Sequence, residues 1–133
     1  MNPMFLAVRT VLSKYATFSG RATRPEYWWW VLAGALMMAV MQIIDGALVA
    51  PMLGFEAFQD EAGQPLSLIF SLVLILPSIA VGVRRLHDTD RTGWWLLLGL
   101  IPLIGTLVLL YFYVQPSDDD NQYGPKVPFG SQN

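Results

Sequence analysis

Long apolar segments alternate with short charged segments along this chain. No charged residue occurs in three stretches, 27–44, 62–83 and 92–117. A helix needs roughly 20 residues, rising about 1.5 Å each, to cross a hydrocarbon core of about 30 Å. All three stretches approach or exceed that length, so the pattern predicts three transmembrane helices, over 26–50, 64–84 and 93–115.

The segment before the first stretch has a different pattern, with apolar residues at helical spacing. The positions that share one face of a helix are Met4, Phe5, Val8, Val11, Leu12 and Tyr15, and those on the other are Arg9, Thr10, Ser13, Lys14 and Thr17. This indicates an amphipathic helix within 1–24 that lies in the membrane interface, with basic residues toward anionic headgroups. A short helix that caps the ends of the bundle fits the pattern equally well.

The fold class that follows is all-α, a polytopic membrane protein. A single membrane domain, 1–133, would hold three transmembrane helices, the N-terminal amphipathic interfacial helix and a solvated polar tail, 116–133. The composition agrees, since 54 % of the residues are hydrophobic and only 14 % are charged, against about 25 % in soluble proteins. A soluble bundle would have to cover three all-round apolar helices with almost no amphipathic ones. The first apolar run also lacks the cleavage pattern of a signal peptide.

Several function classes are excluded by composition. The chain contains no cysteine, which excludes disulfides, thiolate metal ligands and cysteine nucleophiles. The formal net charge of -2 gives no basic field that would attract nucleic acid.

The orientation in the membrane follows from the positions of Lys and Arg, which are retained on the cytoplasmic side. With three spans, seven of the eight basic residues lie on one side, and Lys126 alone lies on the other. We therefore expect a cytoplasmic N-terminus and a periplasmic C-terminus.

Two charged segments resemble each other, SGRATRPEYWWW at 19–30 and VGVRRLHDTDRTGWW at 81–95. Both run into tryptophans, which favour the headgroup level of a membrane. Their mixed charges predict ion pairs between the segments, at the cytoplasmic ends of the first and third spans. An arginine of 84, 85 or 91 should reach Glu26, and Asp88 or Asp90 should reach Arg21 or Arg24. A ligand or ion site built from the same residues is the alternative. The candidate cytoplasmic interface cluster comprises Arg21, Arg24, Glu26, Trp28, Trp29, Arg84, Arg85, His87, Asp88, Asp90, Arg91, Trp94 and Trp95.

No catalytic, cofactor-binding or metal-binding residue is predicted. His87 and Asp88 form the only adjacent histidine and carboxylate pair, but neighbouring residues of a helix do not face each other. The acidic run at 118–120 fails the calcium-loop pattern, because the sixth position is Tyr123 and the twelfth is Phe129. Asp45 should be either hydrated at the outer interface or placed on an ion path.

Four segments carry a resemblance to a known family: GRATRPEYWW at 20–29, RRLHDTDRTGWW at 84–95, IPLIG at 101–105 and NQYGP at 121–125. In order and spacing they resemble bacterial inner-membrane proteins of the domain of unknown function 805 family, over roughly 15–128. The resemblance implies residence in the inner membrane and a bacterial source. It implies no activity.

The sequence therefore favours a small, non-catalytic integral inner-membrane protein. Its expected partners are the lipid bilayer, with anionic phospholipid at the basic face, and a membrane protein or a second copy of the chain. The alternative is an oligomeric small transporter or channel subunit. A conduit should carry ionisable side chains near mid-membrane, and the second and third spans carry none.

Overall fold

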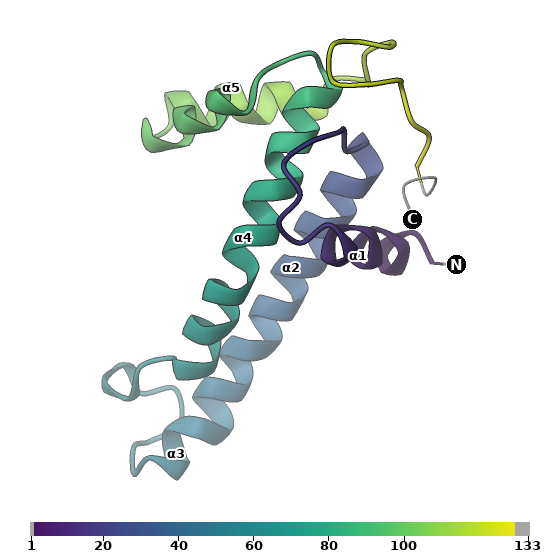
Figure 1. The fold of residues 1–133 in the computed structure, drawn as a ribbon. Helices are drawn as coiled ribbons and strands as arrows, with labels where there is room; N and C mark the ends of the chain where they lie inside the picture. Colours follow the sequence, from purple (N-terminus) through teal and green to yellow (C-terminus); the bar gives the residue numbers. More distant parts are fainter. Residues whose placement is uncertain (1, 130–133) are drawn as a thin grey trace.

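The computed structural model describes residues 2–129, and this part of the chain is helical without a named β-strand (Figure 1). Residues 1 and 130–133, the ends of the predicted interfacial helix and polar tail, lie outside the described residues. The helices are α1 (Pro3–Ser13), α2 (Arg24–Ile44), the π-helical η1 (Asp45–Val49), α3 (Ala50–Met52), the 3₁₀ turn η2 (Asp60–Ala62), α4 (Pro65–Asp88), the 3₁₀ helix η3 (Gly93–Leu100) and α5 (Ile104–Val114).

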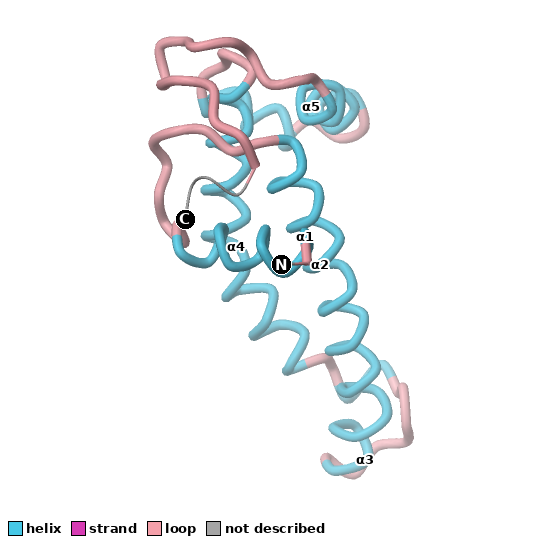
Figure 2. Tube along the Cα trace, turned by 90° about the vertical axis from the view of Figure 1, so that its right-hand side faces the viewer, coloured by secondary structure: helices cyan, strands magenta, loops and turns pink. Residues whose placement is uncertain are grey.

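The helices α2 and α4 lie side by side and form the long axis of the molecule (Figures 1 and 2). With η1 and α3, α2 is continuous over Arg24–Met52. The most apolar 18-residue window of this helix has a mean hydropathy of 1.9, and that of Pro65–Asp88 has 2.5. Only 11 % and 28 % of the residues in their most apolar windows are buried, whereas the core helix of a soluble protein would be mostly buried. Apolar side chains that face outward are what a lipid environment requires. These two helices correspond to the first two predicted spans, and α4 continues beyond the predicted end to Asp88.

The third predicted span, 93–115, is not confirmed, because this segment is not one helix. It consists of η3 and α5, and neither is long enough to cross a bilayer. Pro102 has no amide hydrogen to continue a helix, and the chain reverses at Leu103, whose φ is 64°. Gly105 permits the reversal, since a Cβ atom there would lie 1.7 Å from the carbonyl oxygen of Leu98. The segment is therefore a helical hairpin, and α5 lies across the end of α4 (Figure 1).

The N-terminal helix α1 crosses α2 and also contacts α4. Asn2 caps it, as its side-chain oxygen accepts a hydrogen bond from the Met4 amide at 2.8 Å. Val11 packs in a buried apolar cluster with Trp30 and Val81, while Phe5, from the predicted apolar face, is 60 % exposed. The helix is shorter than the predicted 1–24, and its placement at the membrane interface stays a prediction.

A proline in α4 creates the attachment point for the chain after α1. Pro77 cannot donate a backbone hydrogen bond, so the Val73 carbonyl four residues earlier loses its usual helical partner. The Tyr15 hydroxyl donates a hydrogen bond to that carbonyl. Tyr15 therefore ties the end of α1 to α4 at the position where α4 lacks its own bond.

The N-terminus of α4 is capped by a residue from the other long helix. Gln64, at the N-cap position, makes no side-chain cap bond. Instead the carboxylate of Asp45 accepts hydrogen bonds from the amides of Leu66 at 3.0 Å and Ser67 at 2.7 Å. Asp45 is buried, so the expectation of a hydrated side chain was wrong, and its bonds to two amides give it a structural role.

Replacing Tyr15 by Phe should lower the free energy of unfolding by about 1 to 3 kcal/mol, because the Val73 carbonyl would lose its partner. In a Pro77→Ala background the new amide of residue 77 can bond that carbonyl, so the same replacement should have a much smaller effect. Unfolding in mild detergent, followed by circular dichroism, measures both differences. Equal losses in the two backgrounds would rule out this role for Tyr15.

Candidate functional site

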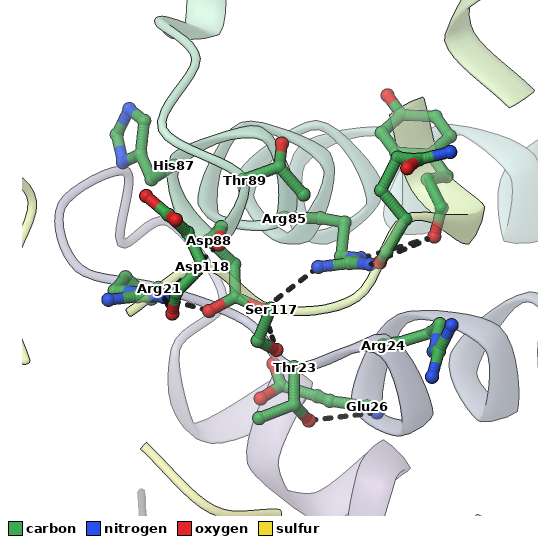
Figure 3. Close-up of polar contacts among 12 residues, drawn as sticks. Arg21, Thr23, Arg24, Glu26, Arg85, His87, Asp88, Thr89, Ser117 and Asp118 are labelled. Carbon is green, nitrogen blue, oxygen red and sulfur yellow. Dashed lines mark hydrogen bonds and ion pairs between the residues drawn. The ribbon is translucent and has the colours of Figure 1, made fainter. Parts of the chain in front are cut away.

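The charged residues of the candidate cluster meet at one end of the α2 and α4 pair, where α2 begins and α4 ends. The segment before α2, the last turns of α4 and the chain after α5 converge there (Figures 2 and 3). We call this region the charged end, and it is centred on five side chains that are buried in the structure: Arg21, Glu26, Arg84, Arg85 and Asp88.

The first ion pair joins the start of α2 to the end of α4. Arg84 Nη1 lies 2.8 Å from Glu26 Oε2, and both side chains are fully buried. The sequence Thr-Arg-Pro-Glu at 23–26 positions Glu26, since Thr23 caps α2 by accepting a hydrogen bond from the Glu26 amide at 3.3 Å. Glu26 Oε1 and two nitrogens of Arg84, Nε and Nη2, are buried without a hydrogen-bond partner. Because both side chains are fully buried, removing either partner would leave the other as an unpaired buried charge.

The carboxylate of Asp88 is shared by two arginines (Figure 3). Arg21 Nε lies 2.8 Å from Oδ1, and Arg85 Nη1 lies 2.8 Å from Oδ2. Arg85 and Asp88 are three residues apart on α4, which places them on one helix face. The Ser117 hydroxyl also donates to Oδ2. Asp88 thus links the segment before α2, the end of α4 and the chain after α5.

Arg85 also holds the C-terminus of α5. Its Nε and Nη2 donate to the Tyr113 carbonyl at 3.2 and 3.1 Å, and Nη2 donates to the Gln115 carbonyl as well. The last carbonyls of a helix lack internal partners and carry partial negative charge, so a guanidinium is a suitable cap. Arg24 makes a similar contact nearby, with Nη1 2.9 Å from the Val114 carbonyl.

The side chain of Arg21 binds backbone carbonyls of the chain after α5. Nη1 donates to the carbonyls of Asp119 and Gly124 at 3.0 Å each, and Nη2 donates to the Asp118 carbonyl. The Asp118 amide in turn donates to the Asp88 carbonyl at 2.7 Å. This segment is therefore bound to the charged end through its backbone, while the side chains at 118–120 stay exposed, as expected for a solvated acidic tail.

His87 packs against this segment and does not form a relay with Asp88. Its ring stacks on Tyr123 with the centroids 4.0 Å apart, and its Nδ1 lies 2.9 Å from the Gly20 carbonyl. The Asn121 side chain donates to the His87 carbonyl at 3.0 Å. The sequence showed these residues only as the NQYGP motif, without a role.

The aromatic residues of the cluster divide between packing and exposure. Trp28 Nε1 donates to the Tyr113 carbonyl at 3.0 Å, and the guanidinium of Arg91 lies 4.1 Å from the ring centre of Phe112. Trp29 is half-buried, and Trp94 and Trp95 are exposed, by 78 % and 46 %. Exposed tryptophans are typical of the level at which a protein leaves the hydrocarbon.

The predicted ion pairs are confirmed for Glu26 with Arg84 and for Asp88 with Arg21. Neither Asp90 nor Arg91 belongs to an ion pair among residues 2–129. Asp90 is exposed and accepts a hydrogen bond from Gln122 at 3.3 Å. The partner of the first segment is the end of the second span, so the predicted meeting with the start of a third span was wrong.

The chemistry of the charged end is that of a clasp. Both buried carboxylates are paired with guanidinium groups, and these pairs join segments that are distant in the sequence. In the described part of the chain, no group of three His, Asp or Glu residues could hold a metal ion. An open polar groove of about 480 Å³ adjoins the clasp, lined among others by Arg91, Gln115 and Asp118.

Exchanging the partners of the first ion pair tests the clasp. Glu26→Arg should reduce the free energy of unfolding by about 3 to 5 kcal/mol, because it places two buried guanidiniums together. Adding Arg84→Glu should restore a large part of the loss, while Arg91→Glu, which makes the same charge change outside the clasp, should not. Thermal unfolding in detergent measures all three variants. Equal rescue by the two second changes would show that net charge, not the pair, sets stability.

Comparison with known proteins extends these observations. Residues 15–125 match the family described as Protein of unknown function (DUF805). Inner membrane protein YhaI of Escherichia coli K12 is 42 % identical over 123 residues, which cover 92 % of this chain and 95 % of the relative. Inner membrane protein YhaH of the same strain is 40 % identical over 116 residues, 86 % of this chain and 90 % of the relative. No solved structure matches the chain. The matched region contains every residue of the clasp, and this chain belongs to the DUF805 family.

Proposed function

We propose that this protein is a non-catalytic integral protein of the bacterial inner membrane whose charged end binds the anionic cytoplasmic leaflet. The names of the relatives YhaI and YhaH support the location. The observation that carries the proposal is the distribution of charge. All eight Lys and Arg residues belong to segments at or leading to the charged end, and the loop 53–64 between the spans has three acidic residues and no basic one.

This distribution supports a cytoplasmic position for the charged end. With two spans and a hairpin that returns, the N-terminal segment and residues 115–129 share that side, and the loop 53–64 faces the periplasm. Lys126 then joins the other basic residues. The two-span topology therefore places all eight basic residues on one side, whereas the three-span topology leaves Lys126 on the other. It also puts the C-terminal segment in the cytoplasm in place of the predicted periplasmic position.

The absence of catalysis is part of the proposal, and the clasp supports it. Glu26 and Asp88 are buried and neutralised by arginines, so an acid or base step would require their pairs to open first. The transporter alternative is disfavoured because α4 has no charged side chain between Pro65 and Val83, and α2 has none between Tyr27 and Ile44.

The lipid contact is assigned to the basic residues that the clasp leaves accessible. Arg21, Arg84 and Arg85 are buried in the clasp and are not among them. Arg9 on α1 is exposed and Lys14 just after it is half-buried. Burial and the positive charge of Arg84 lower the pKa of Lys14. A negatively charged lipid phosphate beside Lys14 would offset the repulsion between Lys14 and Arg84.

Lipid selectivity of the reconstituted full-length protein tests the proposal. Spin-labelled phosphatidylglycerol should associate with the protein more strongly than spin-labelled phosphatidylcholine, and salt should weaken the preference. Arg9→Gln with Lys14→Gln should reduce the preference by roughly fivefold for each charge, at about 1 kcal/mol per residue near an anionic surface.

The matched control is Arg9→Lys with Lys14→Arg, which keeps both charges and should keep the selectivity. Unchanged melting temperatures would show that the variants remain folded. Equal association of the two lipids with the unaltered protein, or a preference that is insensitive to salt, would refute anionic lipid binding.

A further inference from the structure

The hairpin of η3 and α5 presents an apolar surface that the rest of the protein does not cover. Residues 93–114 contain no charge. The apolar residues around its turn are highly exposed, Leu100 by 80 %, Leu103 by 71 % and Ile104 by 68 %. An apolar surface of this kind on a membrane protein is matched by lipid chains.

The backbone of the turn is suited to a position without water. The Ile101 amide donates to Leu98, the Gly105 amide to Ile101 and the Leu107 amide to Leu103, all between 2.9 and 3.2 Å. Pro102 has no amide hydrogen that would need a partner. Irregular backbone is expensive in hydrocarbon when its polar groups are unpaired, and here the turn is largely satisfied.

The backbone conformation of Leu103 is a second, independent indication that the turn contacts lipid. Its φ of 64° lies in the left-handed region, where an L residue with a side chain is strained and glycine is not. The Leu103 side chain is too exposed for packing within the protein to offset this strain. An apolar side chain retained at a strained and exposed position indicates a contact outside the chain.

Both ends of the hairpin are fixed at the charged end, so the hairpin can enter only one leaflet. Arg85 caps the end of α5, and Arg91, just before the hairpin, covers the ring of Phe112 in the last turn of α5. The hairpin and α1 project to opposite sides of the α2 and α4 pair (Figures 1 and 2). At the far end of the pair the structure has only α3 and the loop to α4 (Figure 1).

We infer that the protein is a wedge that prefers membranes whose leaflet at the charged end is convex. In such a leaflet the headgroups are spread apart, and an element that inserts below them gains apolar contact. The hairpin and α1 insert into the leaflet at the charged end and not into the other leaflet. The lipid chains of that leaflet are the partner of their apolar surfaces. The inference rests on the proposed function, because it concerns the same membrane face. The preference for a convex leaflet depends on the shape of the protein, whereas the lipid selectivity depends on its charge.

Sorting into membrane tethers tests the inference on the full-length protein. The chain has no cysteine, so a single cysteine can carry a membrane-impermeant dye. In giant vesicles with mixed insertion, dye on Gln122→Cys marks only molecules with the charged end outward, and dye on Glu56→Cys marks only the opposite orientation. The first population should be enriched in a pulled tether, by about twofold, and the second should be depleted.

Two variants connect the sorting to the hairpin. Leu100→Asp with Leu103→Asp should lift the turn from the hydrocarbon and bring the enrichment close to one. Leu103→Gly removes the strain at this position, so it should raise the melting temperature while it lowers the enrichment part of the way. It serves as the second variant if the double substitution prevents folding.

The outcomes separate the two proposals. Equal sorting of the two orientations, or enrichment of the Glu56→Cys population, would overturn the wedge. Lipid selectivity that persists in that case would leave the proposed function in place. Enrichment that is unchanged in both hairpin variants would also overturn the inference, because the hairpin would then not be the inserted element.

Discussion

The buried carboxylate of Asp88 is the constraint on which the rest of the structure depends. It pairs with Arg21 from the segment before α2 and with Arg85 from its own helix, while the backbone carbonyl of Asp88 accepts the amide of Asp118. Removing a charged group from water costs several kcal/mol, which only a complete set of partners offsets. The segment before α2, the end of α4 and the chain after α5 therefore have to assemble together. Beside them, the buried pair of Glu26 with Arg84 joins the start of α2 to the end of α4.

The hairpin is a consequence of this clasp. Once residues 115–124 are bound to Arg21 and Arg85, the chain that leaves α4 at Asp88 has to return to the same end. A third spanning helix would carry residue 115 about 30 Å away from its partners. Gly105 and Pro102 allow the reversal in between, and the apolar side chains of the hairpin stay outside the protein. The interaction that closes the charged end thus also creates the surface that we assign to lipid.

The sequence predicted what depends on side-chain type and spacing. Continuous apolar runs identified α2 and α4, because lipid contact requires them along the whole length, and opposite charges in two segments predicted the pairs of Glu26 and Asp88. Length alone could not distinguish a span from a hairpin over 93–115, although Pro102 and Gly105 near its centre were a signal. The role of residues 115–124 could not be predicted, since Arg21 binds their backbone carbonyls, which every residue has. Asp45 lies 21 residues before Leu66, whose amide it caps, so no local sequence pattern predicts this cap.

Labelling of single cysteines in cells tests most directly whether the clasp holds both terminal segments at one end. Ser19→Cys and Gln122→Cys lie in the segments before α2 and after α5, and Asp60→Cys lies in the loop between the spans. A membrane-impermeant maleimide should label Asp60→Cys in cells whose outer membrane alone is permeabilised, and it should label the other two only after the inner membrane is opened. Labelling of Gln122→Cys together with Asp60→Cys, while Ser19→Cys stays protected, would contradict the account, because the chain after α5 would then lie across the membrane from Arg21.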